Sequence, residues 1–254
     1  AKIKTMKELE LIMDLHKDAE RQGPGSSVET KKALDFIGFD KTANLQIADI
    51  GCGSGSQTMV LAENTNGHIT AIDLFPEFLE RLKVKAQERG FGNRIETMKK
   101  SMDDLPFHEE KFDVIWSEGA IYNMGFENGI QNWSKFLKKG GYLAVSEISW
   151  ITNERPIELE EHWKKEYPEI DTVSNKIKVL ERNGYVPVAH FILPTYCWID
   201  NYYKPMQHRF DAFIARNHEV ELAKNIVEAE KKEIEIYNKY KDFYSYGFYI
   251  AQKR

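Results

Sequence analysis

The chain has 254 residues, of which 42% are hydrophobic and 30% charged, and its formal net charge is −5. This length suits one α/β domain with a few additions, and the composition excludes both a disordered chain and a membrane protein built of apolar spans. Because acidic and basic residues are interspersed, we expect no broad cationic surface and therefore no nucleic-acid partner.

Cysteine spacing and apolar runs indicate the compartment. Cys52 and Cys197 have neither the spacing of a zinc site nor that of a disulfide framework, so we expect no metal and a reducing compartment. The longest run without a charged side chain, residues 185–199, is shorter than the ~20 residues that span a bilayer. The first residues lack the apolar segment of a signal peptide, although processing could have removed one. The sequence thus predicts a cytoplasmic protein without a membrane span.

Residues 1–40 are expected to form a helical cap. Apolar side chains recur at helical spacing over residues 5–20 and 28–37. The loop between them contains Gly23 and a proline, which end a helix, and serines that can cap the next one. Arg21 and the exposed amides of this loop fit a clamp for a ligand carboxylate, but a plain helix-to-helix turn explains them equally well.

From residue 46 onward, short apolar runs alternate with amphipathic helices, which is typical of a mostly parallel sheet covered by helices in one α/β domain. Residues 195–241 are too long for a bare loop, and we interpret them as a helical insertion that forms a lid. The expected strands are residues 46–50, 68–73, 93–98, 112–117, 141–148, 185–193 and 243–252, and the expected helices include residues 76–89 and 219–241.

The first expected strand runs into a glycine-rich turn, Gly51-Cys52-Gly53, that opens a helix. Such a turn lets a ligand approach the backbone closely, because side chains at the two glycines would stand in its way. A dinucleotide fingerprint needs its third glycine where Ser56 stands, so a nicotinamide cofactor fits imperfectly. Asp49 before the turn is better explained by a positively charged ligand, such as the sulfonium and α-ammonium groups of S-adenosylmethionine.

A second signal is Asp73, which ends the next strand. At this distance from the glycine turn a carboxylate can accept hydrogen bonds from both hydroxyls of a ribose. An aspartate at a strand end is often only a turn former or a helix cap. Its spacing from Gly51 favours the ligand.

With these residues the chain resembles the class I S-adenosylmethionine-dependent methyltransferases, particularly the bacterial small-molecule type related to the ubiquinone and menaquinone biosynthesis methyltransferases. The resemblance covers residues 45–150 and implies a Rossmann-like, seven-stranded sheet whose last strand is antiparallel. It also implies that S-adenosylmethionine lies across the carboxyl ends of the first four strands and leaves as S-adenosylhomocysteine. The motifs that carry it are Asp49–Gly55, Asp73, Leu105-Pro106-Phe107 before Phe112–Ile115, and Phe136–Gly141.

The resemblance also implies roles for single residues around the cofactor. Asp73 would bind the ribose, and Leu74 would cover one face of the adenine. The adenine amine would be taken either by Asp103 or through the backbone of Met102. Glu118 would bind the α-ammonium, although the macrodipole of a helix would also explain a glutamate there. The expected cofactor contacts are Arg21, Gly23, Asp49, Gly51, Cys52, Gly53, Asp73, Leu74, Ser101, Met102, Asp103, Ser117 and Glu118.

The acceptor side is less specific. Tyr122, Trp150, Trp198 and Tyr202 are candidates for the walls of a pocket for a small organic acceptor, although such aromatic residues are more often core. In-line methyl transfer needs alignment and exclusion of water rather than a fixed triad. If the acceptor is a hydroxyl or a phenol, Tyr122 and Glu147 are the candidate bases, and both could equally be structural.

Two other functions fit parts of this pattern. A nicotinamide-dependent oxidoreductase shares the fold, and a protein that binds S-adenosylmethionine without turnover shares the pocket. The fourth strand ends in Ser117-Glu118-Gly119-Ala120 rather than Asn-Pro-Pro or Asp-Pro-Pro, which disfavours an amino-methyltransferase of DNA or RNA. The acceptor, the kind of atom methylated and the oligomeric state stay open, a dimer being one alternative.

Overall fold

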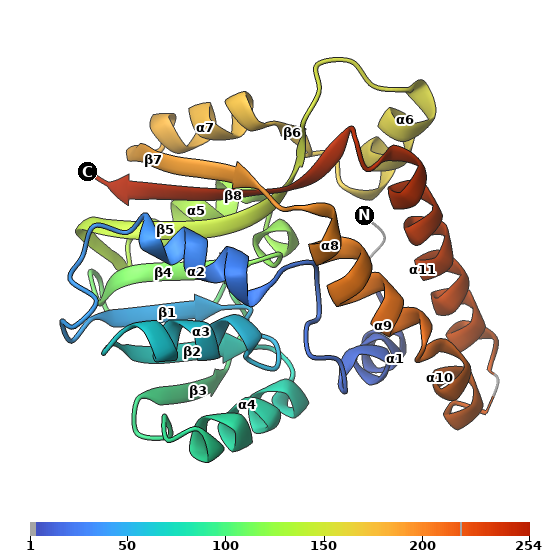
Figure 1. Ribbon diagram of the computed structural model, residues 1–254, viewed down its shortest axis with the longest axis horizontal. Coiled ribbons are helices and arrows are strands. Elements are labelled where there is room, and N and C mark those ends of the chain that lie inside the picture. The colour runs from blue at the N-terminus through green and yellow to red at the C-terminus, as the bar shows by residue number, and fades with distance from the viewer. Residues whose placement is uncertain (1–3, 219) are drawn as a thin grey trace.

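The computed structural model describes residues 4–218 and 220–254, and its centre is one mixed sheet with the strand order β3-β2-β1-β4-β5-β8-β7 (Figure 1). Strands β1 to β5 are parallel to one another, and β8 is antiparallel to both β5 and β7. The predicted Rossmann-like sheet with an antiparallel last strand is therefore confirmed. The strands are β1 (Gln46–Ile50), β2 (His68–Asp73), β3 (Ile95–Lys99), β4 (Phe112–Glu118), β5 (Leu137–Trp150), β7 (Tyr185–Ile192) and β8 (Tyr244–Lys253), and a two-residue β6 (Asp171–Thr172) pairs with β5.

Strand β5 begins four residues before the expected start at residue 141. The pair Gly140-Gly141 reads as a turn in the sequence, but the strand continues through it. Leu137 pairs with Phe112, and the register then shifts before Tyr142 pairs with Val114. A β-bulge thus accommodates the glycines, a feature that periodicity alone does not reveal.

Helices cover both faces of the sheet, as parallel strands require. On β1, Ile47 packs into one hydrophobic cluster, and Ala48 and Ile50 pack into the other. Figure 1 shows the helices of the first face in front of the sheet and those of the second behind it. The first set is α2 (Ser27–Asp35), α3 (Ser56–Asn64) and α4 (Pro76–Glu88), and the second is α5 (Phe126–Ser134) and α7 (Val173–Arg182).

The segment between β7 and β8 forms helices beyond the carboxyl ends of the parallel strands (Figure 1). We call residues 195–241 the lid. It comprises α8 (Thr195–Trp198), a π-helical turn (Ile199–Tyr203), α9 (Lys204–Gln207), α10 (Phe210–Arg216) and α11 (Glu221–Tyr240). Residue 219 within the lid, like residues 1–3 of the expected N-terminal cap, lies outside the described residues.

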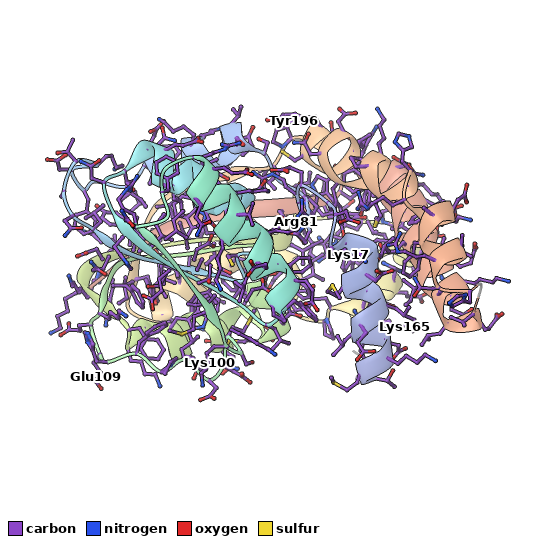
Figure 2. All side chains as sticks on the ribbon, turned by 90° about the horizontal axis from the view of Figure 1, so that it is seen from below. Lys17, Arg81, Lys100, Glu109, Lys165 and Tyr196 are labelled. Atoms are coloured by element: carbon purple, nitrogen blue, oxygen red, sulfur yellow. The ribbon has the colours of Figure 1, made fainter. Side chains whose placement is uncertain are left out.

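The N-terminal helix α1 (Met6–His16) packs against the lid. The guanidinium of Arg216 contacts the Asp14 carboxylate at 2.7 Å, and Arg209 Nε donates to the Leu15 carbonyl at 3.1 Å. On the opposite side, Arg81 of α4 donates to the carbonyls of Lys17 and Ala19, and Figure 2 shows Arg81 beside Lys17. The lid and the sheet domain thus both hold the residues that lead into the loop after α1.

Trp198 lies in the interior of the lid rather than on a pocket wall, which corrects the expectation from sequence. Its side chain is 2% exposed, its ring stacks on Tyr237 with 4.6 Å between centroids, and its Nε1 donates to Ser245 Oγ at 2.9 Å. Trp150 is also core: it packs edge-on against Tyr244. The sequence pattern of a lid does not distinguish aromatic residues that face a ligand from those that pack against each other.

We therefore expect Trp198→Ala to act on stability rather than on turnover. Truncating a buried tryptophan leaves a cavity and removes its contacts, which typically costs about 3–5 kcal/mol of unfolding free energy. Urea denaturation measures this loss, with Trp198→Phe as the milder control. If the unfolding free energy fell by less than about 1 kcal/mol while methyl transfer dropped strongly, Trp198 would be part of the acceptor site after all.

Candidate functional site

A cavity of about 350 Å³ lies at the carboxyl ends of β1, β2 and β4. This is the edge at which open α/β sheets bind ligands. The loop after α1 forms part of its wall. The expected site residues that line it are Arg21, Gly23, Gly51, Cys52, Gly53, Asp73, Leu74, Ser101, Met102, Asp103, Glu118 and Tyr122.

The packing around the glycine turn also requires glycine at two positions. Gly51 and Gly53 have φ of +72° and +55°, which disfavours any side chain. A Cβ on Gly53 would lie 2.2 Å from Gln22 Oε1, and one on Gly51 would lie 2.5 Å from the Ala120 Cβ. Protein atoms thus occupy the space into which a side chain at either glycine would project, while both glycines line the cavity.

Gln22 is a site residue that the sequence analysis missed. Its Oε1 accepts from the Ser54 backbone amide at 2.9 Å, and its Nε2 donates to Ser54 Oγ and to the Ala19 carbonyl, each at 3.1 Å. This one side chain joins the loop after α1 to the glycine turn. A glutamine in a loop gives no signal in a single sequence, because its partner lies 32 positions away.

Asp73 ends β2 with both carboxylate oxygens turned toward backbone amides. Its Oδ2 accepts from Gly53 at 2.9 Å, and its Oδ1 accepts from Phe75 at 3.1 Å. Burial raises the pKa of this carboxyl group, and the two amides oppose the rise. Each oxygen of a carboxylate can accept a further hydrogen bond, so the group is oriented and still able to bind a pair of hydroxyls.

Hydrogen bonds fix the loop after β3, which contains Ser101, Met102 and Asp103. Trp133 of α5 donates its Nε1 to the Met102 carbonyl at 3.0 Å, and Ser101 Oγ donates to the Asp103 carboxylate. Leu74 lines the same cavity and is 49% exposed although it is a large apolar residue. An exposed leucine and a polar loop in one cavity suit a flat ring with polar edges.

At the other end of the cavity, Arg21 and Glu118 form a buried pair, with Nη1 and Oε1 3.8 Å apart. Trp116 Nε1 and Thr30 Oγ1 donate to Glu118 Oε2 at 2.9 and 2.8 Å. Burial raises the pKa of Glu118, and the Arg21 charge opposes the rise. Arg21 Nη2 is buried and has no hydrogen-bond partner among the described residues.

This geometry contradicts one of the two readings of the loop. A plain turn with a solvated arginine would leave Arg21 exposed, yet only 9% of it is. The loop is also tied to the lid, because Asn201 Nδ2 donates to the Gly25 carbonyl at 2.8 Å. A buried guanidinium with a free donor calls for an anion at this end of the cavity.

Asp49 and Ser117 were expected at the cofactor, but they lie beneath the site and do not line the cavity. Asp49 accepts from Thr58 Oγ1 at 2.6 Å and from Gln57 Nε2 at 3.4 Å, and Ser117 Oγ donates to the Ile50 carbonyl at 2.8 Å. Their side chains therefore fasten the first turn of α3 and the end of β1. The spacing in the sequence predicts that Asp49 lies next to the glycine turn. It does not predict to which side of the strand the Asp49 side chain points.

Asp49 should make the ligand-free protein less stable as pH rises. Burial raises the pKa of Asp49 to about 7, so between pH 5 and 7 the folded state holds a proton that the unfolded state has released. We expect this residue to remove about 1–3 kcal/mol of unfolding free energy between pH 5 and 7.5.

Urea denaturation at these two pH values tests this expectation. Asp49→Asn should flatten the decline, whereas the exposed control Asp104→Asn should retain it. An unchanged pH dependence in Asp49→Asn would mean that Asp49 is already ionised in the folded protein at low pH.

Glu147, a candidate base, does not line this cavity either. It is 1% exposed, accepts from the Tyr167 hydroxyl at 2.6 Å, and pairs with Lys176 Nζ at 3.5 Å. Its carboxylate is therefore part of a buried structural network. Tyr202, a predicted pocket wall, lies in the lid and stacks on His16 with 6.0 Å between centroids. Tyr122 alone of the acceptor candidates lines the cavity, and it is 46% exposed.

Within residues 4–218 and 220–254, no helix is long and apolar enough to cross a membrane. The described histidines, cysteines and carboxylates form no group of three that would hold a metal ion.

Comparisons with known proteins agree with this site. Residues 41–233 match a family model described as a methyltransferase domain. An uncharacterized protein of Haemophilus influenzae is 22% identical over 183 residues, which cover 61% of this chain and 72% of that protein. A sarcosine/dimethylglycine N-methyltransferase of Aphanothece halophytica is 26% identical over 100 residues, which cover 39% of this chain and 36% of the relative.

Solved structures share the whole fold. A methyltransferase from Geobacter sulfurreducens, in complex with S-adenosylhomocysteine, superposes with a TM-score of 0.82 at 17% identity, and each chain is covered completely. One from Thiobacillus denitrificans, with the same ligand, gives 0.81 at 19% identity and covers 99% of this chain and 100% of that one. In contrast, the alignments with three curated relatives of known activity span only 36% to 48% of their lengths.

Proposed function

The chain belongs to the family of methyltransferase domains and uses S-adenosylmethionine, and from this premise we propose that it methylates a small molecule held between the sheet and the lid. The observation that carries the proposal is the buried Arg21–Glu118 pair with its free Nη2. A cation and an anion side by side match the carboxylate and the ammonium of an α-amino acid, which is the methionine end of this cofactor.

The rest of the cavity suits the nucleoside end. The Asp73 carboxylate would accept from the two ribose hydroxyls while it keeps the amides of Gly53 and Phe75. Leu74 would cover one face of the adenine. Asp103 would accept from the adenine amine, and the Met102 carbonyl, which accepts from Trp133 and has a second lone pair, is the alternative acceptor.

The nicotinamide alternative has less support. A nicotinamide dinucleotide has neither a free α-carboxylate nor a free α-ammonium group. The Arg21–Glu118 pair would therefore have no matching group on such a ligand. The glycine turn also lacks the third glycine of the dinucleotide fingerprint. Isothermal titration calorimetry separates the two, since we expect 1:1 binding of S-adenosylhomocysteine and no binding of NADH.

When bound, S-adenosylmethionine supplies a methyl group on a positively charged sulfur. The protein's contribution is to align the acceptor and to exclude water. Tyr122 lies at the cavity wall, but burial and the nearby Glu233 raise its pKa, so its phenol stays protonated at neutral pH. We infer that Tyr122 donates a hydrogen bond to the acceptor rather than acting as its base.

A turnover assay distinguishes an enzyme from a binding protein. The protein is incubated with methyl-labelled S-adenosylmethionine and a pool of small metabolites. We expect label in a small-molecule fraction and stoichiometric S-adenosylhomocysteine. Tight binding of the cofactor without transfer to any pool would support the non-catalytic alternative.

We propose the following organisation and location for the chain. It forms one methyltransferase domain, with residues 1–40 as the N-terminal cap and residues 195–241 as the lid. Both cysteines are buried and unpaired, which agrees with a reducing compartment and therefore with the cytoplasm. Cell fractionation with an antibody to the chain tests the location.

A further inference from the structure

Helix α11 carries two carboxylates on the side that faces the protein. Glu230 and Glu233 are one turn apart and share this side with the buried residues Val227, Ile234 and Tyr237. An amphipathic helix normally keeps its charges on the outer face, because a buried charge without a partner is costly. The outer face of α11 does carry glutamates, among them Glu228 and Glu235, which are exposed. The inward pair therefore needs an explanation.

The described residues provide no cation in contact with this pair. Among residues 4–218 and 220–254, neither glutamate forms an ion pair within 4.0 Å, and Glu230 Oε2 is buried without a hydrogen-bond partner. The Tyr203 hydroxyl faces Glu233 and slightly opposes the rise of its pKa. Burial, together with the mutual repulsion of the pair, raises the pKa of Glu230 to about 8. Burial and Glu166 raise that of Glu233 to about 6, and the exposed Lys4 acts weakly in the opposite direction.

Three tyrosines lie on the side of the protein that the inward carboxylates face. The ring of Tyr203 lies 5.2 Å from that of Tyr202 and 5.5 Å from that of Tyr237 on α11, and the ring of Trp198 lies 4.8 Å from that of Tyr246 and 4.6 Å from that of Tyr237, measured between centroids. Burial is the main cause that raises the pKa of Tyr122, Tyr202 and Tyr246, and the charge of Glu233 contributes in each case. Among the described residues, the hydroxyls of Tyr202 and Tyr246 have no hydrogen-bond partner, although the two rings are only half-buried. We call these five residues the acidic-aromatic cluster. Its side chains offer negative charge, aromatic faces and free hydroxyls together.

The cluster borders the cofactor cavity. Tyr122 belongs to both the cluster and the cavity. It lines the cavity, and the charges of Glu233 and Glu230 contribute to its raised pKa. The ring of Tyr246 lies 3.0 Å from the position that a Cβ on Gly119 would occupy, and Gly119 also lines the cavity. A ligand at the cluster would therefore lie next to the bound cofactor and beneath the lid.

Carboxylates and aromatic faces together recognise an organic cation, through charge-assisted hydrogen bonds and cation–π contacts. We propose that the methyl acceptor carries a cationic amine whose ammonium group is held by Glu230 and Glu233 against the rings of Tyr202 and Tyr246. This ammonium group orients the acceptor, and another atom of the acceptor with a free electron pair takes the methyl group as the C–S bond breaks, because an ammonium nitrogen has no lone pair. This inference rests on the proposed function, because it takes the neighbouring cavity as the cofactor site. An anionic acceptor would meet two carboxylates without a counter-ion, and a neutral one would leave them unpaired.

Three probes of equal size and different charge test this proposal. Calorimetry compares benzylamine, benzyl alcohol and benzoate on the full chain saturated with S-adenosylhomocysteine. We expect benzylamine to bind at least tenfold more tightly than the other two. Glu230→Gln with Glu233→Gln should remove this preference, and the outer-face control Glu228→Gln with Glu235→Gln should retain it.

The pH dependence of the unmodified protein provides a second test that does not depend on a variant. An alkylammonium stays protonated below pH 8, whereas the two carboxyls lose their protons between about pH 5 and 8. Benzylamine affinity should therefore rise over this range. The raised pKa values of the three tyrosines keep their hydroxyls protonated over this range, and Glu166 and Lys4 are the other charged groups that face the pair.

The two proposals fail separately in these experiments. If the unmodified chain does not bind S-adenosylhomocysteine, the proposed function is wrong. If it binds S-adenosylhomocysteine but shows no preference for benzylamine, or prefers benzoate, the cationic acceptor is wrong. An effect of the outer-face variant equal to that of the inward one would also overturn the assignment, because it would reflect the overall charge of α11.

Discussion

Arg21→Ala is expected to weaken the binding of S-adenosylhomocysteine by roughly 30-fold to several thousandfold. Removing one partner of a buried, hydrogen-bonded charge pair typically costs about 2–5 kcal/mol, which corresponds to this range of affinity. The side chain would bind the cofactor carboxylate through its free Nη2 and also balances Glu118, so its loss removes one contact and leaves a buried anion. Calorimetry on the purified variant measures the change.

Arg21→Lys is the matched control, because it keeps the charge but not the planar fork. We expect its affinity to lie between those of the unmodified chain and Arg21→Ala. Thermal denaturation separates a binding effect from a loss of folding. If Arg21→Ala folds and binds S-adenosylhomocysteine within threefold of the unmodified chain, the cofactor carboxylate lies elsewhere.

Asp73→Ala should weaken S-adenosylmethionine and S-adenosylhomocysteine by the same factor. A hydrogen bond to a charged group contributes about 1.5–3 kcal/mol, so the loss of two ribose contacts predicts a weakening of roughly 10²- to 10⁴-fold. The substitution also removes the acceptor for the Gly53 and Phe75 amides, which loosens the glycine turn. Parallel titrations with the two ligands measure both factors.

Asp73→Asn is the control for this prediction, since it keeps one oxygen acceptor and should lose less affinity than alanine. The two ligands share the ribose and differ at the sulfur. Unequal losses for the two ligands would therefore place Asp73 near the sulfur instead of the sugar.

Sequence reasoning located the site because its main parts are local. The glycine turn follows a strand directly, and Asp73 ends the neighbouring strand, so both reach the same edge of a parallel sheet. The residues that contact the site residues could not be predicted from the sequence. Gln22 meets Ser54, and Thr30 meets Glu118, only through the packing of distant segments, which a single sequence does not encode as a pattern.

The sequence did not distinguish between the buried and the ligand-facing aromatic residues of the lid. Trp198 and Tyr202 have similar sequence surroundings, yet the first is enclosed by core and the second belongs to the acidic-aromatic cluster. Helical periodicity did contain one usable signal there. Glu230 falls in phase with Val227, Ile234 and Tyr237, so a charge on the inward face of α11 could have been read from the spacing alone.

Amide hydrogen exchange with and without S-adenosylhomocysteine tests the central claim most directly. That claim is that the glycine turn and the loop after α1 hold the cofactor together under the lid. Ligand should slow exchange at Gly51–Gly55, at Arg21–Ser27 and in the lid helices, because Gln22 and Asn201 join these segments. Protection confined to the glycine turn, or none at all, would contradict this account.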